Sequence, residues 1–150
     1  MTPERCPAGS EPLPGGTCAA EERCGDATWP ESGPLPAGAR IVRVRVGADD
    51  AGADGSERAP FGSLDRAARA AGEGGAVLLA DGTYPAALHV TGALTIAGRC
   101  PGRAVLQGGA SDASEVLRVS GGGAVTLRDV TLRGGGTGLF VAGAARASLR

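Results

Sequence analysis

Short apolar runs of period two recur along the second half of the chain, and glycines separate them. The segment Glu115 to Arg128 aligns with the segment Thr137 to Arg150 at a constant shift of 22 residues. A period in the low twenties, with alternating apolar positions, is typical of one rung of a stacked β-solenoid. The aligned apolar pairs are Leu117/Leu139, Val119/Val141, Val125/Ala147 and Leu127/Leu149.

Pairs of apolar residues with one residue between them extend this pattern back to residue 88. Residues two apart on a strand point to the same face, so we expect the paired residues inside and the intervening ones outside. The inward pairs are Leu88/Val90, Leu94/Ile96, Ala104/Leu106, Leu117/Val119, Val125/Leu127, Val130/Leu132 and Leu139/Val141. Parallel stacking then predicts two outward columns, one of His89, Arg118 and Phe140 and one of Thr95, Thr126 and Ser148.

Two elements are predicted upstream of these runs. The segment Ile41–Val46 alternates apolar residues with arginine, which indicates a half-buried strand. Ser63 can cap a helix over Ser63–Ala71, and Gly72 ends it. Its apolar face is formed by Leu64, Ala67, Ala68 and Ala71. Such a short helix is marginal alone, so we expect it to cover the N-terminal end of the solenoid.

A loop crowded with carboxylates, Gly47–Ser56, lies between the strand and the helix. Asp49, Asp50 and Asp54 could supply the oxygen ligands that Ca²⁺ prefers, which makes Ca²⁺ the cofactor to test. The loop departs from the EF-hand spacing and lacks a closing glutamate. These departures favour a solvated turn over a metal site.

Residues 1–39 are rich in Pro, Gly, Cys and Glu without periodicity, so we assign them as a loop-like, Cys-rich segment before a second unit, residues 40–150. A zinc site is disfavoured, since there is no Cys-x-x-Cys and no nearby histidine. Disulfides, or simply unpaired thiols, are favoured instead, and the three possible pairings stay open. The candidates are Cys6, Cys18, Cys24 and Cys100.

Disulfides indicate an extracytoplasmic location. Met1 is not followed by the apolar region of a signal peptide. We therefore expect that Met1 is not the natural secretory start, or that the chain is part of a longer one.

The charge balance and the composition narrow the classes of molecule that the protein could bind. The 15 basic residues are balanced by 16 acidic ones, and the net charge of −1 offers no electrostatic footprint for nucleic acid. No run approaches the roughly 18 apolar residues of a membrane span. Only 3% of the chain is aromatic, so the core must be aliphatic.

Several of these segments together resemble the N-terminal part of the right-handed parallel β-helix proteins, the pectate-lyase-like superfamily of secreted bacterial proteins. The resemblance is carried by Val46-Gly47 with the acidic Gly-rich loop, Pro60–Leu64, the Ala-rich helix after it and the turn Asp81–Tyr84. It implies an all-β fold with a short N-terminal capping helix. Lyases of that family use Ca²⁺ held by strand carboxylates and an arginine base. The outward columns here match only Arg118 by type and contain no aspartate cluster.

We therefore predict a non-catalytic, extracytoplasmic β-helix module that is surface-associated or binds a polysaccharide or cell-surface glycan. Its binding residues are predicted to be His89, Arg118 and Phe140. The alternative is the N-terminal portion of a polysaccharide lyase or glycoside hydrolase whose catalytic residues lie beyond residue 150.

The repeat stops in mid-rung at Arg150, in the position that Arg128 holds one rung earlier. We accordingly expect downstream rungs, and end-to-end association of the isolated chain.

Overall fold

The computed structural model describes residues 28–30, 37–100, 103–109, 115–134, 136–143 and 145–149, together with the backbone of residues 10–12 and 18–20. Within the Cys-rich segment, β1 (Ser10–Pro12) and β2 (Cys18–Ala20) pair antiparallel, with Pro12 opposite Cys18. This short strand pair was not predicted, because the segment lacks periodicity. Cys6, Cys24 and Arg150 lie outside the described residues.

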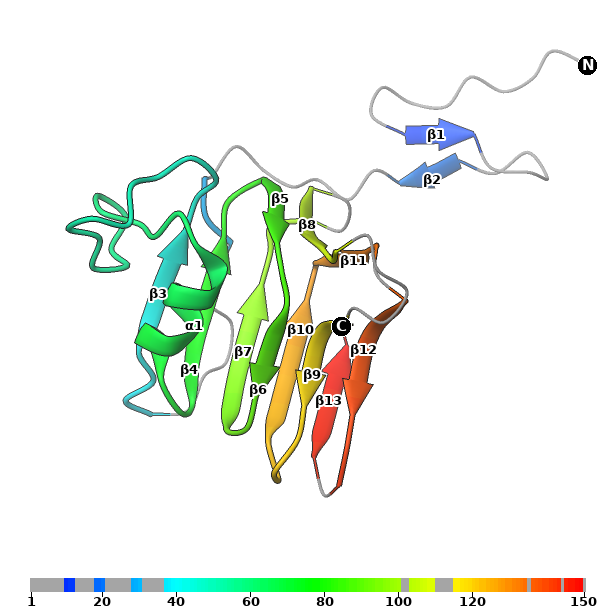
Figure 1. Cartoon of the computed structure of the whole chain (residues 1–150). Coiled ribbons are helices and arrows are strands. Elements are labelled where there is room, and N and C mark those ends of the chain that lie inside the picture. Colours follow the sequence, from blue (N-terminus) through cyan, green and yellow to red (C-terminus); the bar gives the residue numbers. More distant parts are fainter. Residues whose placement is uncertain are drawn as a thin grey trace, which may run out of the picture.

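Parallel strands form three sheets (Figure 1). The first sheet consists, in sequence order, of β3 (Ile41–Val44), β4 (Gly75–Leu79), β7 (Ala93–Ala97), β10 (Ala124–Arg128) and β13 (Arg146–Leu149). The second consists of β5 (Gly82–Pro85), β8 (Ala104–Gln107) and β11 (Thr131–Arg133). The third consists of β6 (Leu88–Val90), β9 (Glu115–Val119) and β12 (Thr137–Val141).

The chain visits these sheets in a fixed cyclic order. It leaves β4 for β5 in the second sheet, passes through β6 in the third, and returns to the first sheet as β7, directly beside β4. The next strands repeat this circuit twice, as far as β12 and then β13. The described part of the molecule is therefore mostly β, with parallel sheets, as the period-two pattern predicted.

The strand register confirms the alignment read from the sequence. Leu117 pairs with Leu139 between β9 and β12, and Leu127 pairs with Leu149 between β10 and β13. Arg118 lies between His89 and Phe140 in the third sheet. Thr126 lies between Thr95 and Ser148 in the first sheet. Both predicted outward columns exist.

Most of the predicted inward residues form one core. Those of β6 to β10 are buried, namely Leu88, Val90, Leu94, Ile96, Ala104, Leu106, Leu117, Val119, Val125 and Leu127. Val130, Leu132 and Leu139 are only partly buried, and Val141 is 40% exposed. Asp129, predicted at a turn, has a φ of 53°, a left-handed conformation that Asp tolerates.

The predicted helix is present as α1 (Leu64–Ala71). Ser63 caps it, since the Arg66 N–H donates to the Ser63 Oγ at 3.5 Å, and Gly72 ends it with a φ of 67°. Its buried residues Leu64, Ala67 and Ala71 join the core. The helix packs on β3 and β4, so it covers the core beside the first strand (Figure 1).

Two predicted boundaries are wrong. The strand predicted over Ile41–Val46 ends at Val44, and Val46 is 47% exposed, because a turn begins where the Ala48 N–H donates to the Arg45 carbonyl and Gly47 takes a φ of 82°. The turn predicted at Asp81–Thr83 is shorter, since β5 already starts at Gly82. In the described residues no helix is long and apolar enough to cross a membrane.

A buried tyrosine ties the first strand to the circuit that follows. Tyr84 of β5 is 1% exposed, and its hydroxyl lies 2.7 Å from the Ala80 carbonyl oxygen and 3.1 Å from that of Val44. Burial disfavours the phenolate and raises the pKa of Tyr84 to about 12. The neutral hydroxyl therefore remains the donor at any ordinary pH.

Candidate functional site

The column His89, Arg118 and Phe140 lies on the outer face of the third sheet, and all three residues are exposed. Each comes from a different strand, and parallel pairing places them side by side. The Arg118 guanidinium carbon lies 4.7 Å from the centroid of the Phe140 ring, within the range of a cation–π contact. Phe140 is 39% exposed, so part of an apolar ring is open to solvent.

Arg118 is held by a bidentate pair with Glu115 of the same strand. Its Nε donates to one carboxylate oxygen at 2.6 Å and its second guanidinium nitrogen donates to the other at 2.8 Å. These hydrogen bonds lower the pKa of Glu115 and raise the pKa of Arg118. Both groups are charged near neutral pH, so the pair is electrically balanced. Its fork geometry fixes the guanidinium plane beside the Phe140 ring.

At the other end of the column, the Nε2 of His89 lies 2.5 Å from the Oγ of Ser120. The pair joins β6 to the turn after β9. His89 also lines a groove of about 610 Å³ that runs between α1 and β6. The column thus begins at the edge of a concavity and ends on an exposed aromatic ring.

Sequence reasoning missed Glu115 and Ser120. Glu115 has the same parity as the inward Leu117 and Val119, so strict alternation pointed it to the core. It begins the strand, however, and its carboxylate reaches Arg118. Ser120 follows Arg118 by two residues, so strand alternation puts both side chains on the same, outward face. This spacing could have placed Ser120 beside the column.

The three aspartates of the acidic loop are each engaged with the backbone and do not gather into one cluster. Each carboxylate accepts a backbone N–H, Asp49 from Ala51 at 2.9 Å, Asp54 from Ser56 at 2.8 Å and Asp50 from Gly62 at 2.8 Å. Hydrogen bonds from Ser56 lower the pKa of Asp54. Among the described residues no group of three or more His, Cys, Asp or Glu could hold a metal ion. The loop forms turns, the interpretation that the sequence favoured.

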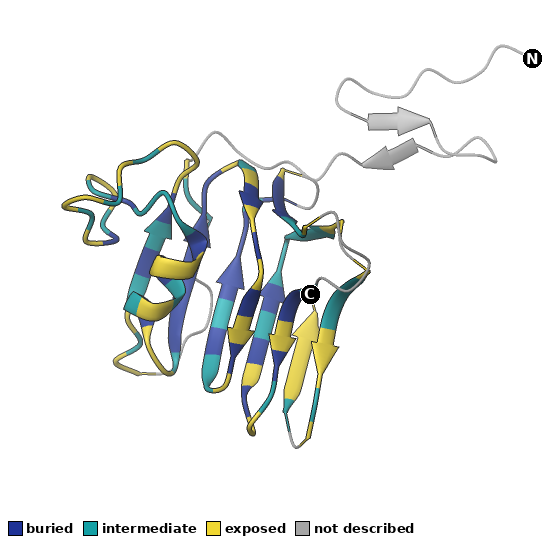
Figure 2. Ribbon diagram, in the orientation of Figure 1, coloured by how far each residue is buried: buried dark blue, intermediate teal, exposed yellow. Residues whose placement is uncertain are grey.

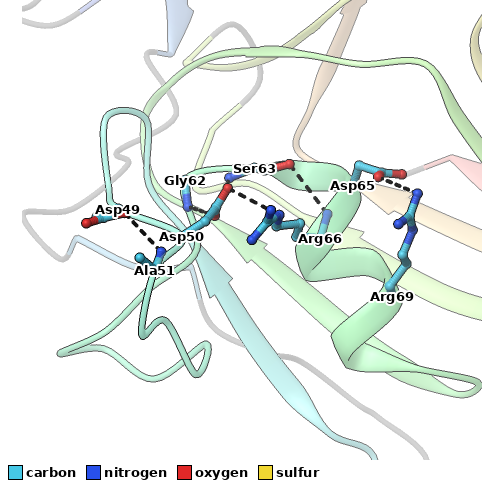
Figure 3. Close-up of polar contacts among 8 residues, drawn as sticks. All are labelled: Asp49, Asp50, Ala51, Gly62, Ser63, Asp65, Arg66 and Arg69. Atoms are coloured by element: carbon cyan, nitrogen blue, oxygen red, sulfur yellow. Dashed lines mark hydrogen bonds and ion pairs between the residues drawn. The ribbon is translucent and has the colours of Figure 1, made fainter.

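Asp50 has a structural role instead (Figure 3). Its Oδ1 also accepts the Ser63 N–H at 3.1 Å, and its Oδ2 lies 3.8 Å from the Arg66 Nε. The carboxylate sits at the N-terminus of α1, where amides are free and the dipole favours negative charge. A Cβ at Gly62 would collide with the Ala48 carbonyl, so the loop and helix are closely packed there.

Cys100 is buried and disulfide-bonded. The other three cysteines of the chain, Cys6, Cys18 and Cys24, all lie in residues 1–39, so this bond connects the Cys-rich segment to the turn before β8. Which of the three is the partner lies outside the described side chains. Nearby, the Oδ2 of Asp81, the residue before β5, lies 3.6 Å from a guanidinium nitrogen of Arg99 and 3.6 Å from one of Arg103.

The second outward column, Thr95, Thr126 and Ser148, carries hydroxyls on the first sheet without an aromatic ring or a charge. Neither outward column contains an aspartate or a glutamate. Comparisons of the chain with protein-family models, with curated proteins and with solved structures found no match.

Proposed function

We propose that residues 40–150 are the first coils of a right-handed parallel β-helix in an extracytoplasmic, surface-associated protein, and that the third sheet binds a neutral polysaccharide without cleaving it. The cyclic order of three parallel sheets and the like-on-like register support the β-helix. The right hand is the one that parallel crossover connections take in about 98% of cases. The disulfide at Cys100 supports an oxidising compartment.

The observation that carries the binding proposal is the column of Phe140, Arg118 and His89 with its two supporting partners. A sugar ring offers an apolar face and a rim of hydroxyls. Phe140 provides an exposed ring for that face, and the Arg118–Glu115 pair provides donors and acceptors in a fixed geometry. The site is pre-organised, so binding would order few additional side chains.

Charge balance favours a neutral glycan over a polyuronate. Glu115 already satisfies the Arg118 fork with two hydrogen bonds, and a uronate carboxylate would have to displace it. A sugar hydroxyl pair can bind the outer side of the Arg118–Glu115 pair without breaking it. Binding should therefore depend only weakly on salt.

The test is binding of residues 1–150 to an array that contains neutral glycans and polygalacturonate. The double variant Arg118→Ala/Phe140→Ala should lose binding to the neutral glycans at least tenfold. The matched control Thr95→Ala/Thr126→Ala, on the other outward column, should bind as the unchanged protein does. Equal binding by both double variants would remove the third sheet from consideration.

A further inference from the structure

The three sheets do not begin at the same level of the stack. The first sheet starts with β3, which pairs with β4, whereas the third sheet starts with β6 in the circuit after β4. Beside β6, at the level of β3, the third sheet has no strand among the described residues. The groove between α1 and β6 lies at this position, and its volume is about 610 Å³.

The backbone of β6 presents hydrogen-bonding groups to this groove. The Ser120 N–H donates to the Val90 carbonyl, so the backbone groups of Val90 and, two residues earlier, Leu88 point to β9. Alternation along a parallel strand then directs the N–H and carbonyl of His89 to the opposite edge. That edge can template one more strand.

The rest of the lining suits an extended peptide. Ala68, Leu88, Val90 and Leu94 supply apolar surface. Asp65 and Arg69 neutralise one another at 2.8 Å on the helix. Glu73 has no ion pair among the described residues, and its side chain lies beside Gly92, just past the carboxyl end of β6. Glu73 therefore places one negative charge, not paired within the described residues, at one end of the groove.

We propose that this groove binds an extended peptide that adds to β6 as a parallel strand, with apolar residues facing inward and a basic residue near its carboxyl end, opposite Glu73. Backbone hydrogen bonds to His89 supply affinity and the alternating side chains supply selectivity, as in other cases of strand addition. A glycan lacks the alternating N–H and carbonyl groups that the β6 edge requires. The inference is independent of glycan binding on the outer face.

The probe is a fluorescent peptide with the sequence of residues 41–46, Ile-Val-Arg-Val-Arg-Val, which alternates as the groove requires. In the protein this sequence supplies β3, whose Val42 and Val44 are fully buried against the core. Fluorescence anisotropy with residues 1–150 should show saturable binding. When one arginine of the peptide aligns with His89, the N–H groups of the valines face β6. A peptide N-methylated at its valines should therefore bind at least tenfold more weakly. A peptide with Glu in place of both Arg residues should also bind more weakly.

Protein variants locate the site. Arg69→Trp should weaken binding of the Arg peptide at least tenfold, because the ring fills the groove. The loss cannot be electrostatic, since this change frees the negative charge of Asp65. The control Arg66→Trp, on the same helix but outside the groove lining, should leave binding unchanged. Glu73→Gln should weaken it about two- to fivefold, the size of a partly exposed ion pair.

Thermal melts of all three variants establish that they are folded. Absence of saturable binding, equal binding of the N-methylated peptide, or full binding by a folded Arg69→Trp variant would each overturn the proposal. Loss of peptide binding in the folded variant Arg118→Ala/Phe140→Ala would also overturn it, because neither residue lines the groove. Competition by a neutral oligosaccharide but not by unlabelled peptide would assign the groove to a glycan instead.

Discussion

Strands β10 and β13 carry the same inward pattern in the same register, yet their burial differs. Leu127 of β10 is 2% exposed, whereas Leu149, its partner in β13, is 64% exposed. Figure 2 shows β13 exposed along its length beside a buried interior. At the other end, Val42 and Val44 of β3 are fully buried, because α1 packs on that strand. Alternation thus sets the direction of a side chain, and only a neighbouring layer buries it.

We expect the largest loss of stability from a substitution at the end of the molecule that α1 covers. Leu64→Asp places an unpaired carboxylate at a position that is 2% exposed, and it should lower the free energy of unfolding by about 4 kcal/mol or more. Leu149→Asp should change it by about 0.5 kcal/mol or less. Urea denaturation of both variants measures the difference. Similar effects of the two changes would mean that α1 does not protect the core.

A milder pair of substitutions compares β10 and β13 directly. Leu127→Ala should lower the free energy of unfolding by about 2–5 kcal/mol, since it opens a cavity in the core. Leu149→Ala in the paired position should lower it by about 0.5 kcal/mol or less. Thermal and urea melts provide the measurement. A large loss in Leu149→Ala would show that β13 is covered in solution, as end-to-end association predicts.

The disulfide of Cys100 connects the Cys-rich segment to the circuits, and removing it should have an intermediate effect. Cys100→Ala should lower the free energy of unfolding by about 2–4 kcal/mol, typical of a native disulfide. Peptide mapping without reductant should recover Cys100 linked to a peptide from residues 1–39 and identify the partner. Recovery of Cys100 as a free thiol from oxidised protein would contradict the bond.

Asp50 joins the acidic loop to α1. Its substitution should therefore destabilise only the end of the molecule that α1 covers. Asp50→Ala removes the acceptor of two amide hydrogen bonds and should lower the free energy of unfolding by about 1–2 kcal/mol. Asp49→Ala, which removes one exposed local bond, is the matched control and should cost less. Hydrogen exchange should quicken in α1 for Asp50→Ala alone. If adding Ca²⁺ stabilised the unchanged protein but neither variant, the turn interpretation would be wrong.

The smallest effect concerns Glu115 in the third sheet. Its pKa is lower in the folded protein, so the stabilising contribution is complete above the unfolded pKa, near 4.3, and is lost as pH falls through the folded pKa. Acid should therefore destabilise the unchanged protein slightly more than Glu115→Gln below about pH 4.3. NMR titration of the Glu115 carboxyl provides the check. An unshifted pKa in the folded protein would mean that the pair with Arg118 does not persist in solution.

Local rules acting on the sequence were enough to predict the strand alternation, the 22-residue register, both outward columns and the capped helix. Side-chain direction, capping and turn residues act over a few positions, so a short stretch of chain contains all the information that they need. The sequence likewise identified Cys100 as a disulfide candidate, because the chain has 4 cysteines and the other three lie together in residues 1–39.

Burial and polar pairing, in contrast, emerged only when the strands and loops were assembled. The Glu115–Arg118 fork, the Asp50 link to α1 and the groove beside β6 depend on strand ends and loops, where alternation stops holding. The acidic loop shows the same limit, since the two backbone amides that donate to Asp50 come from Gly62 and Ser63, more than ten residues away in the sequence. The alternation of side chains is a property of one strand, whereas their burial and their polar contacts depend on the layers packed around that strand.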